Sequence, residues 1–544
     1  MCLNNIIVQS TSTIRNKSVV LFLSVGALII PIILIELNVL KVTGGILIYP
    51  LDDTYIHMSI AKNLALHNNW GISANEFQSA SSSLLYTLLL SGLFKLFSVN
   101  TLIPFIINLI AGIVLLFVIQ RSLQKENISF VAQLIILLLV IFFTPLPIII
   151  ISGMEHTLQC LFSFLFIFNF CDWINKNESA KTKFPTSLFI YGMITCALRY
   201  EALFIIAIAC CVLLYYRKII AAFALGFIAI LPLIIFGIFS IAKGSYFLPN
   251  SVLLKASPVE LQGNGFINFI SNILIDKLTT AKSGITALAT QRLLLILPLV
   301  YLFFYQQIKK EITYKLIALF LIVCTLLQLS FAKTGWFYRY EAYLILCSTV
   351  FVSILFSRYY KPLRLRENKV LLPVLVLISF FLFFPLILRS AAAYSKASQA
   401  CINVYEQQYQ MGSFVKKYYN TDTLAVNDIG AVSFFNESSV IDLWGLANMQ
   451  VAKAKKDNAA TPDFLNAVTK NNNAKFAIVY DSWFDSVLLN KWNKVATWQI
   501  QNNVICGDAT VSFYAVDLNN SSSLKVNLEA YQNLLPKDVT VKYY

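Results

Sequence analysis

Apolar runs long enough to cross a lipid bilayer recur along the first 388 residues, and they constrain the fold more than any other feature. The runs cover residues 19–40, 102–120, 131–149, 157–173, 187–199, 202–216, 219–241, 293–308, 315–332, 342–357 and 370–388. Hydrophobic residues make up 58% of the chain and charged residues 13%, which is not the composition of a soluble domain. We therefore predict an α-helical polytopic membrane protein with about 11 transmembrane helices.

The composition changes sharply after this apolar part. Residues 390–544 contain 13 Lys and 13 Asp plus Glu, so they carry no net charge. Short β-type segments at Leu424–Val426, Val440–Leu443 and Phe476–Tyr480 alternate with helical stretches, which is typical of a small α/β domain. We predict two domains: 1–389 in the membrane, and 390–544 as a soluble α/β domain. Cys401 and Cys506 are the only cysteines of this tail, and they would form a disulfide only in an oxidising compartment.

The net charge of +15 comes from short loops between the apolar runs. These basic loops alternate along the chain, which places the N-terminus in the cytoplasm and the tail outside. The charge thus indicates membrane topology and no nucleic-acid partner. The assignment requires that the apolar stretch 84–97 does not span the membrane. We predict that it lies on the outer interface, as does a helix over 54–68 whose Ile56, Ile60 and Leu64 recur every four residues.

With this topology, ionisable residues gather at the outer ends of the spans. They are Asp52, Asp53, Glu155, Arg199, Glu201, Lys255, Lys333 and Arg339. Each ionisable group at membrane depth costs roughly 2.5 to 3.5 kcal/mol on insertion scales. The sequence therefore predicts one shared polar cavity that opens outward.

Both acidic segments have a structural and a chemical interpretation. Asp52 and Asp53 precede the predicted interfacial helix, so one of them could cap its N-terminus. A carboxylate there could instead take a proton from an attacking hydroxyl, and its neighbour could orient it or hold a cation. Ser152 and Glu155 have the spacing of a capping box that opens the next span.

The basic residues leave similar alternatives open. Arg199 and Glu201 lie at a tight turn between two short runs, where an ion pair or a phosphate contact would fit. Lys255 could extend its ammonium group to the interface or bind a lipid phosphate. Arg339 lies among interface-type aromatic residues and is also a phosphate candidate.

Two kinds of site are absent from the sequence. His156 beside Glu155 is too isolated to indicate a metal site, and no Cys or His cluster has ligand spacing. No glycine-rich phosphate loop is present, which argues against direct use of ATP. The sequence leaves open whether a divalent cation is needed.

Taken together, these motifs resemble those of bacterial GT-C membrane glycosyltransferases. The resemblance rests on Asp52 to His57, His67 to Gly71, Gly153 to Glu155, Leu198 to Glu201, Leu248 to Ser251 with Lys255, Tyr338 to Tyr340, Asp428 to Ala431 and Val440 to Leu443. It is strongest to the arabinofuranosyltransferases that use decaprenyl-phosphate arabinose, and weaker to protein mannosyltransferases and the lipid A aminoarabinose transferase. Tyr200 stands where that family often has proline.

The resemblance implies a GT-C fold in a bacterial cytoplasmic membrane. It implies a polyprenyl-phosphate sugar as donor and a cell-envelope glycan or glycolipid as acceptor. The expected residues are Asp52 or Asp53 as the base, Arg199, Lys255 and Arg339 on the donor phosphate, and Tyr55, His57, Glu155, Glu201, Asn250 and Tyr338 on the acceptor or the sugar. The alternatives are a polymerase or ligase of lipid-linked saccharides, an inactive relative that only binds them, and a transporter.

Overall fold

The computed structural model of the 544-residue chain describes residues 2–177, 183–255, 300–302, 304–359 and 371–544. It divides into two compact units, each made of three segments. The helical unit comprises Met1–Leu34, Ile106–Pro232 and Ala256–Ser395. The mixed unit comprises Ile35–Phe105, Leu233–Lys255 and Lys396–Tyr544. The predicted domain boundary at residue 389 stays a prediction.

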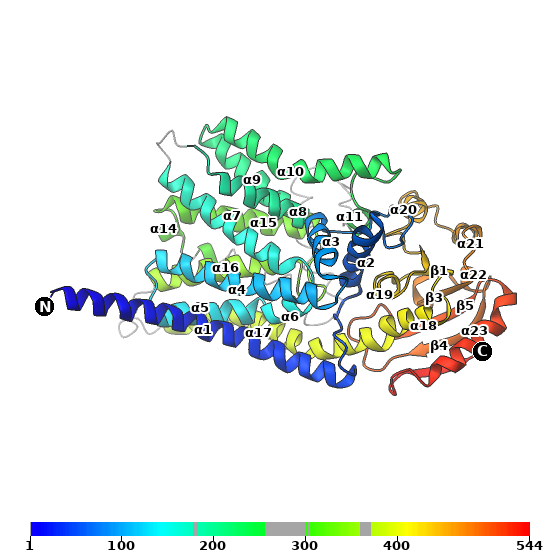
Figure 1. The fold of residues 1–544 in the computed structure, drawn as a ribbon. Coiled ribbons are helices and arrows are strands. Elements are labelled where there is room, and N and C mark those ends of the chain that lie inside the picture. The colour runs from blue at the N-terminus through cyan, green and yellow to red at the C-terminus, as the bar shows by residue number, and fades with distance from the viewer. Residues whose placement is uncertain (1, 178–182, 256–299, 303, 360–370) are drawn as a thin grey trace. The chain divides into compact units, whose positions relative to one another are not determined.

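The helical unit is a bundle of apolar helices, several of which run side by side (Figure 1). Its helices are α5 (Phe130–Phe143), α6 (Leu146–Ile151), α7 (His156–Lys176), α8 (Thr186–Leu198), α9 (Ala202–Tyr215), α14 (Tyr305–Ile308), α15 (Ile312–Phe331) and α16 (Ala342–Tyr359). Four further helices have residues in both units: α1 (Cys2–Val42), α4 (Leu102–Lys125), α10 (Ile219–Ala242) and α17 (Leu371–Val404).

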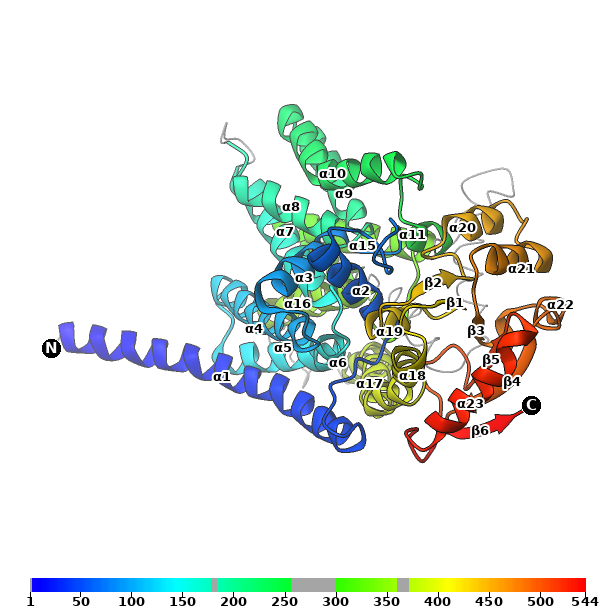
Figure 2. The same cartoon turned by 45° about the vertical axis from the view of Figure 1, so that its right-hand side comes forward.

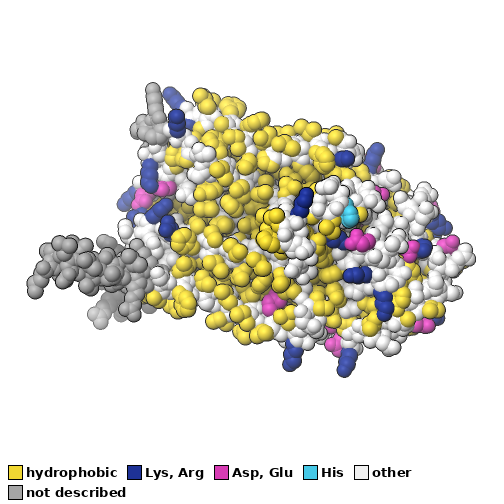
Figure 3. Space-filling view, viewed as in Figure 1, with side chains coloured by type: hydrophobic (Ala, Val, Ile, Leu, Met, Phe, Trp, Pro, Cys, Tyr) yellow, Lys and Arg dark blue, Asp and Glu magenta, His cyan; other side chains and the backbone are white. Residues whose placement is uncertain are grey.

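Within the described ranges, six helices are long and apolar enough to cross a membrane: 18–42 of α1, α4, α7, α10, α15 and α16. The shorter apolar helices α5, α8 and α9 coincide with three further predicted spans. Residues 371–388 of the run at 370–388 fall within α17, and residue 370 and residues 293–299 and 303 of the run at 293–308 lie outside the described residues. Many apolar side chains of these helices face outward (Figure 3), as Ile220 does with 87% of its surface exposed. The chain is therefore a multi-pass membrane protein.

The mixed unit contains a six-stranded sheet in the order β2-β1-β3-β5-β4-β6 (Figure 2). The strands are β1 (Thr423–Val426), β2 (Ser439–Asp442), β3 (Phe476–Val479), β4 (Asn493–Gln499), β5 (Thr510–Ala515) and β6 (Thr540–Tyr543). The first three are parallel, and the others pair antiparallel. The α/β domain and the three strands expected from the sequence are confirmed.

Helices surround this sheet and complete the mixed unit. They are α2 (Asp52–His67), α3 (Leu84–Phe97), α11 (Asn250–Lys255), the π-helix η1 (Tyr405–Tyr409), α18 (Gln410–Tyr418), α19 (Gly430–Phe434), α20 (Met449–Lys456), α21 (Pro462–Asn471), the 3-10 turn η2 (Asp481–Trp483), α22 (Ser486–Leu489), the 3-10 turn η3 (Leu518–Asn520) and α23 (Ser521–Gln532). Cys401 and Cys506 are free thiols, so the disulfide is not formed.

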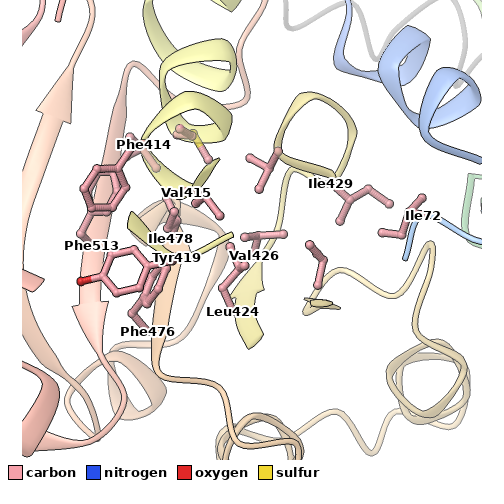
Figure 4. Close-up of a cluster of buried hydrophobic side chains, with 14 of the residues drawn as sticks. Ile72, Phe414, Val415, Tyr419, Leu424, Val426, Ile429, Phe476, Ile478 and Phe513 are labelled. Atoms are coloured by element: carbon pink, nitrogen blue, oxygen red, sulfur yellow. The ribbon is translucent and has the colours of Figure 1, made fainter. Parts of the chain in front are cut away.

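Segments far apart in sequence build the core of the mixed unit. Side chains of α18, β1, β3 and β5 interdigitate on one face of the sheet (Figure 4). Ile72, from the segment between α2 and α3, lies in the same cluster. Ile56 and Ile60 of α2 also belong to it. Burial of this apolar surface therefore holds the N-terminal helix α2 against the C-terminal sheet.

The environment of α2 differs from the prediction. The helix forms where expected, but its polar side does not face water, because α3 and α19 pack against it. His57 is 2% exposed and Lys62 is 6% exposed. The polar side chains of α2 must therefore find partners inside the protein, and the position of α2 at the membrane interface stays a prediction.

Candidate functional site

Two groups of predicted site residues lie in different units. The first surrounds Asp52 at the start of α2. Its carboxylate accepts hydrogen bonds from the backbone N–H groups of Gly430 at 2.7 Å and Ala431 at 2.8 Å. The N-cap of α2 is Leu51, so the interpretation of Asp52 as the cap is wrong. Desolvation, followed by the negative charge of Asp428, raises the pKa of Asp52 above its usual range, although the two N–H groups oppose the shift.

Other polar contacts reinforce the junction between α2 and the segment 430–437. The Lys62 ammonium donates to the carbonyl oxygens of Phe434 and Asn436, both at 3.0 Å, and to the Glu437 carboxylate at 3.1 Å. Burial lowers the pKa of Lys62, and Glu437 opposes that shift. These contacts use the three ammonium protons, so Lys62 fixes the helix in place.

This junction requires a glycine at position 430. A Cβ there would lie 2.1 Å from the Asp52 carbonyl oxygen and 2.7 Å from its carboxyl carbon. We expect Gly430→Ala to lower the stability of the protein by about 1 to 3 kcal/mol or more through overpacking. The control is Gly92→Ala on an exposed part of α3, where a Cβ meets nothing within 4 Å. Thermal unfolding in detergent measures both, and equal melting temperatures would contradict the tight junction.

The other predicted residues of the mixed unit are held by the protein itself. The Tyr55 hydroxyl accepts from the Tyr49 N–H at 3.0 Å. His57 Nδ1 lies 3.0 Å from the Thr87 hydroxyl and 3.1 Å from the Ser81 hydroxyl. Each therefore has a structural partner.

Three predicted residues of the mixed unit remain. Asn250 is 1% exposed and begins α11, and its N–H donates to the Ser79 carbonyl at 3.0 Å. Asp53 lies on the first turn of α2 and is half-buried. Lys255 ends α11, and its side chain lies outside the described residues.

The second group lies in the helical unit, where Arg199 joins two carboxylates. Its Nη1 donates to Glu155 at 3.0 Å, and its Nε donates to Glu201 at 3.0 Å. The capping-box interpretation of Glu155 is wrong, because its side chain makes no cap bond and contacts Arg199 instead. The turn between α8 and α9 is confirmed, with Arg199 in an extended conformation. The alternative of an ion pair between Arg199 and Glu201 is also confirmed.

Arg339 joins the same group through Tyr340. The Arg339 guanidinium lies 4.9 Å from the centre of the Tyr340 ring, and that of Arg199 lies 5.5 Å from it. Arg339 also donates to the Met154 sulfur, which adjoins Glu155. The structure thus brings Glu155, Arg199, Glu201 and Arg339 together. Lys333, expected in the same cavity, is exposed.

A buried ion pair that was not expected from the sequence lies beside this group. Arg389 and Glu341 are both fully buried, and Arg389 Nη2 lies 2.9 Å from a Glu341 oxygen. Arg389 also donates to the Tyr338 carbonyl at 2.6 Å. Its position at the end of the last apolar run could have revealed it, because an ionisable residue there marks the edge of the membrane.

This ion pair holds a strained loop. Gly335, Trp336, Phe337 and Tyr338 all have positive φ, from 34° to 82°. Glu341 accepts from the Gly335 N–H at 2.8 Å, so the ion pair ties both ends of this segment. Left-handed backbone costs of order 1 to 3 kcal/mol at each non-glycine residue, and it persists only where surrounding contacts enforce it. The contacts that enforce this backbone conformation therefore fix the positions of Tyr338 and of the neighbouring Arg339.

The cavity predicted to unite both groups stays a prediction. One cavity of about 480 Å³ lies within the mixed unit, lined by Lys62, Lys416 and Glu437 among others, and no predicted site residue lines it. Among the residues that the structure describes, no three His, Cys, Asp or Glu side chains are placed to hold a metal ion.

Residues 400–514 match the model of a domain of unknown function, DUF8728. None of the curated proteins matches the sequence. The chain is similar over 91% of its length to the oligosaccharyltransferase of Archaeoglobus fulgidus, solved in the apo form, with 12% identity, 74% of that chain covered and a TM-score of 0.48. It is also similar over 91% of its length to ArnT from Cupriavidus metallidurans, solved with undecaprenyl phosphate bound, with 10% identity, 98% of that chain covered and a TM-score of 0.49.

Proposed function

We propose that this chain is a GT-C membrane glycosyltransferase that moves a glycosyl unit from a polyprenyl-phosphate donor to a cell-envelope glycan or glycolipid outside the cytoplasm. The observation that supports it most is the group of the buried Glu155, Arg199 and Arg339 with the half-buried Glu201, because ionisable side chains at the ends of membrane helices commonly serve substrates. The order of sequence motifs along the chain supports the same family.

Asp53 is the base in this proposal, and Asp52 positions it. Both carboxylate oxygens of Asp52 accept backbone N–H groups, which fixes the first turn of α2. Asp53 follows on the same turn and would take the proton of the acceptor hydroxyl. The acceptor oxygen then bonds to the anomeric carbon, the bond from that carbon to the phosphate oxygen breaks, and polyprenyl phosphate leaves.

Arg199 and Arg339, which share the Tyr340 ring, would stabilise the phosphate as its charge develops. A guanidinium fork matches the geometry of phosphate oxygens. Lys255 stays a candidate for the same role. Tyr55, His57, Glu155, Glu201, Asn250 and Tyr338 would shape the acceptor and sugar sites.

The direct test is transfer by the purified full-length protein in lipid nanodiscs. The donors are decaprenyl-phosphate arabinose and an undecaprenyl-phosphate hexose, each radiolabelled in the sugar, with cell-envelope glycolipid as acceptor. Transfer of label to glycolipid supports the proposal. Transfer only from a donor with many sugars would favour a polymerase or ligase, and uptake into liposomes without bond cleavage would favour a transporter.

Arg339→Lys tests the phosphate role without removing the charge. Loss of the guanidinium fork is expected to lower kcat/KM for the donor by about tenfold to a hundredfold, corresponding to about 1.4 to 2.8 kcal/mol. The matched control is Arg121→Lys on α4, a basic residue remote in sequence from the candidate residues. An unchanged kcat/KM in Arg339→Lys would remove Arg339 from the site.

A further inference from the structure

A hydrogen-bonded network lies at the carboxyl ends of β1 and β3 in the mixed unit. Asp428 follows β1 and Tyr480 follows β3, and these two parallel strands are neighbours. The Tyr480 hydroxyl oxygen lies 2.6 Å from Asp428 Oδ2 and 2.7 Å from Gln407 Oε1. Gln408 Nε2 lies 3.0 Å from both Asp428 Oδ2 and the Tyr480 oxygen.

The orientation of the Gln407 amide is fixed by its surroundings. Its Nε2 donates to the carbonyl oxygens of Asp508 at 3.1 Å and Ala509 at 3.4 Å. The reverse orientation would place Oε1 against two other carbonyl oxygens. Gln407 Oε1 therefore faces Tyr480 and can only accept a hydrogen bond.

A count of protons then decides the charge of Asp428. Tyr480 has one hydroxyl proton but two close oxygen neighbours, Gln407 Oε1 and Asp428 Oδ2. If that proton goes to Gln407, the 2.6 Å contact between Asp428 and Tyr480 needs a second proton. If it goes to an ionised Asp428, the Gln407 oxygen faces the Tyr480 oxygen at 2.7 Å with no hydrogen between them. Only a proton on Asp428 satisfies all these contacts.

We propose that Asp428 holds a proton at neutral pH and donates it to Tyr480, and that this neutral carboxyl is a positioning residue for Asp52 and the first turn of α2. The role in positioning rests on the proposed function, since that turn carries Asp53. Asp52 keeps its negative charge, because both its oxygens accept backbone N–H groups.

The electrostatic interactions around Asp52 and Asp428 are consistent with one proton shared between these two carboxyl groups. Desolvation and then the charge of Asp428 raise the pKa of Asp52, so the two carboxyls do not ionise independently. The two backbone N–H groups that donate to Asp52 favour its charged form, which leaves the shared proton on Asp428. The titratable groups near Asp428 come from several elements. They are Asp52 and Asp53 from α2, Glu406 from η1, Tyr480 after β3, and Cys506 with Asp508 from the loop before β5. Burial raises the pKa of Glu406 to about 7.

A proton on Asp428 makes the free energy of unfolding fall as pH rises. A carboxyl whose pKa is raised in the folded state contributes stability that is present at low pH and is lost as pH rises through the folded pKa. Alkaline pH would therefore ionise Asp428 beside the already charged Asp52, and the repulsion between the two carboxylates would loosen α2 from residues 430 and 431.

Infrared spectroscopy of the purified full-length protein tests the inference directly. At pH 7 we expect the C=O stretching band of a protonated carboxylic acid, shifted in D2O. All samples carry Glu36→Gln and Glu406→Gln, which remove two other buried glutamates that can hold a proton at pH 7. In that background the band should disappear in Asp428→Asn and persist in Asp52→Asn. Loss in Asp52→Asn with retention in Asp428→Asn would overturn the assignment, and so would no band at all.

A second variant, Tyr480→Phe, keeps the inference testable if Asp428→Asn does not fold. Tyr480→Phe removes the acceptor of the Asp428 proton, so the band should weaken at pH 7 while Asp428 itself is intact. The alkaline fall in melting temperature should be smaller in Asp428→Asn than in the parent, because the amide cannot ionise. Identical pH profiles would contradict the inference. None of these readouts uses glycosyl transfer, so an inactive protein with the predicted spectrum would reject the proposed function and leave the proton assignment standing.

Discussion

Asp53→Asn is expected to lower the rate of glycosyl transfer by a factor of about 10² to 10⁴, because an amide cannot take the proton of the acceptor hydroxyl. Its melting temperature should stay close to that of the parent. The rate is measured under donor and acceptor saturation, so that the chemical step and not substrate binding is compared.

The matched control for Asp53 is its neighbour Asp52. Asp52→Ala leaves the buried N–H groups of Gly430 and Ala431 without their acceptor, and each lost acceptor costs about 1 to 3 kcal/mol. We therefore expect Asp52→Ala to lower the melting temperature. A stable but inactive Asp52→Asn protein together with an active Asp53→Asn protein would reverse the two roles. Full turnover in both single variants and in the double variant would reject a carboxylate base in this segment.

Arg389→Met is expected to cause the largest loss of stability, about 3 to 5 kcal/mol, because it leaves the Glu341 charge buried and unpaired. The loop from Gly335 to Tyr338 should also relax, since Arg389 no longer holds the Tyr338 carbonyl. Unfolding in increasing SDS measures the stability, and cleavage within the loop by chymotrypsin measures its exposure.

An exposed ion pair of the same unit provides the control. Lys176 and Asp172 lie one helical turn apart with side chains 67% and 37% exposed. Lys176→Met should change stability by less than about 0.5 kcal/mol. The double variant Arg389→Met with Glu341→Gln should lose less than the sum of the two single losses, because no charge is left alone. Equal effects of Arg389→Met and Lys176→Met, or additive losses in the double variant, would contradict a coupled buried pair.

The proposed roles of these residues depend on their partners, and the sequence reveals few of those partners. Asp52 lies next to a helix start, so local spacing favoured an N-cap. Its actual hydrogen-bond donor, Gly430, is 378 positions away along the chain. Glu155 likewise had the local pattern of a capping box, and its partner Arg199 is 44 positions away. In both cases the carboxylate pairs with a distant residue and not with the nearby helix end. Leaving a buried charge unpaired costs more free energy than leaving a helix N-terminus without a side-chain cap.

The sequence by itself determined the membrane class, most of the spans and three strands of the sheet. These depend on local hydrophobicity and on alternation along the chain, which each segment carries without reference to the others. The tertiary structure alone decided that α2 is buried against α19 and that Arg389 pairs with Glu341. It also decided that Asp428 and Tyr480 meet at adjacent strand ends. These features depend on contacts between distant segments, which close packing selects and which no local pattern encodes.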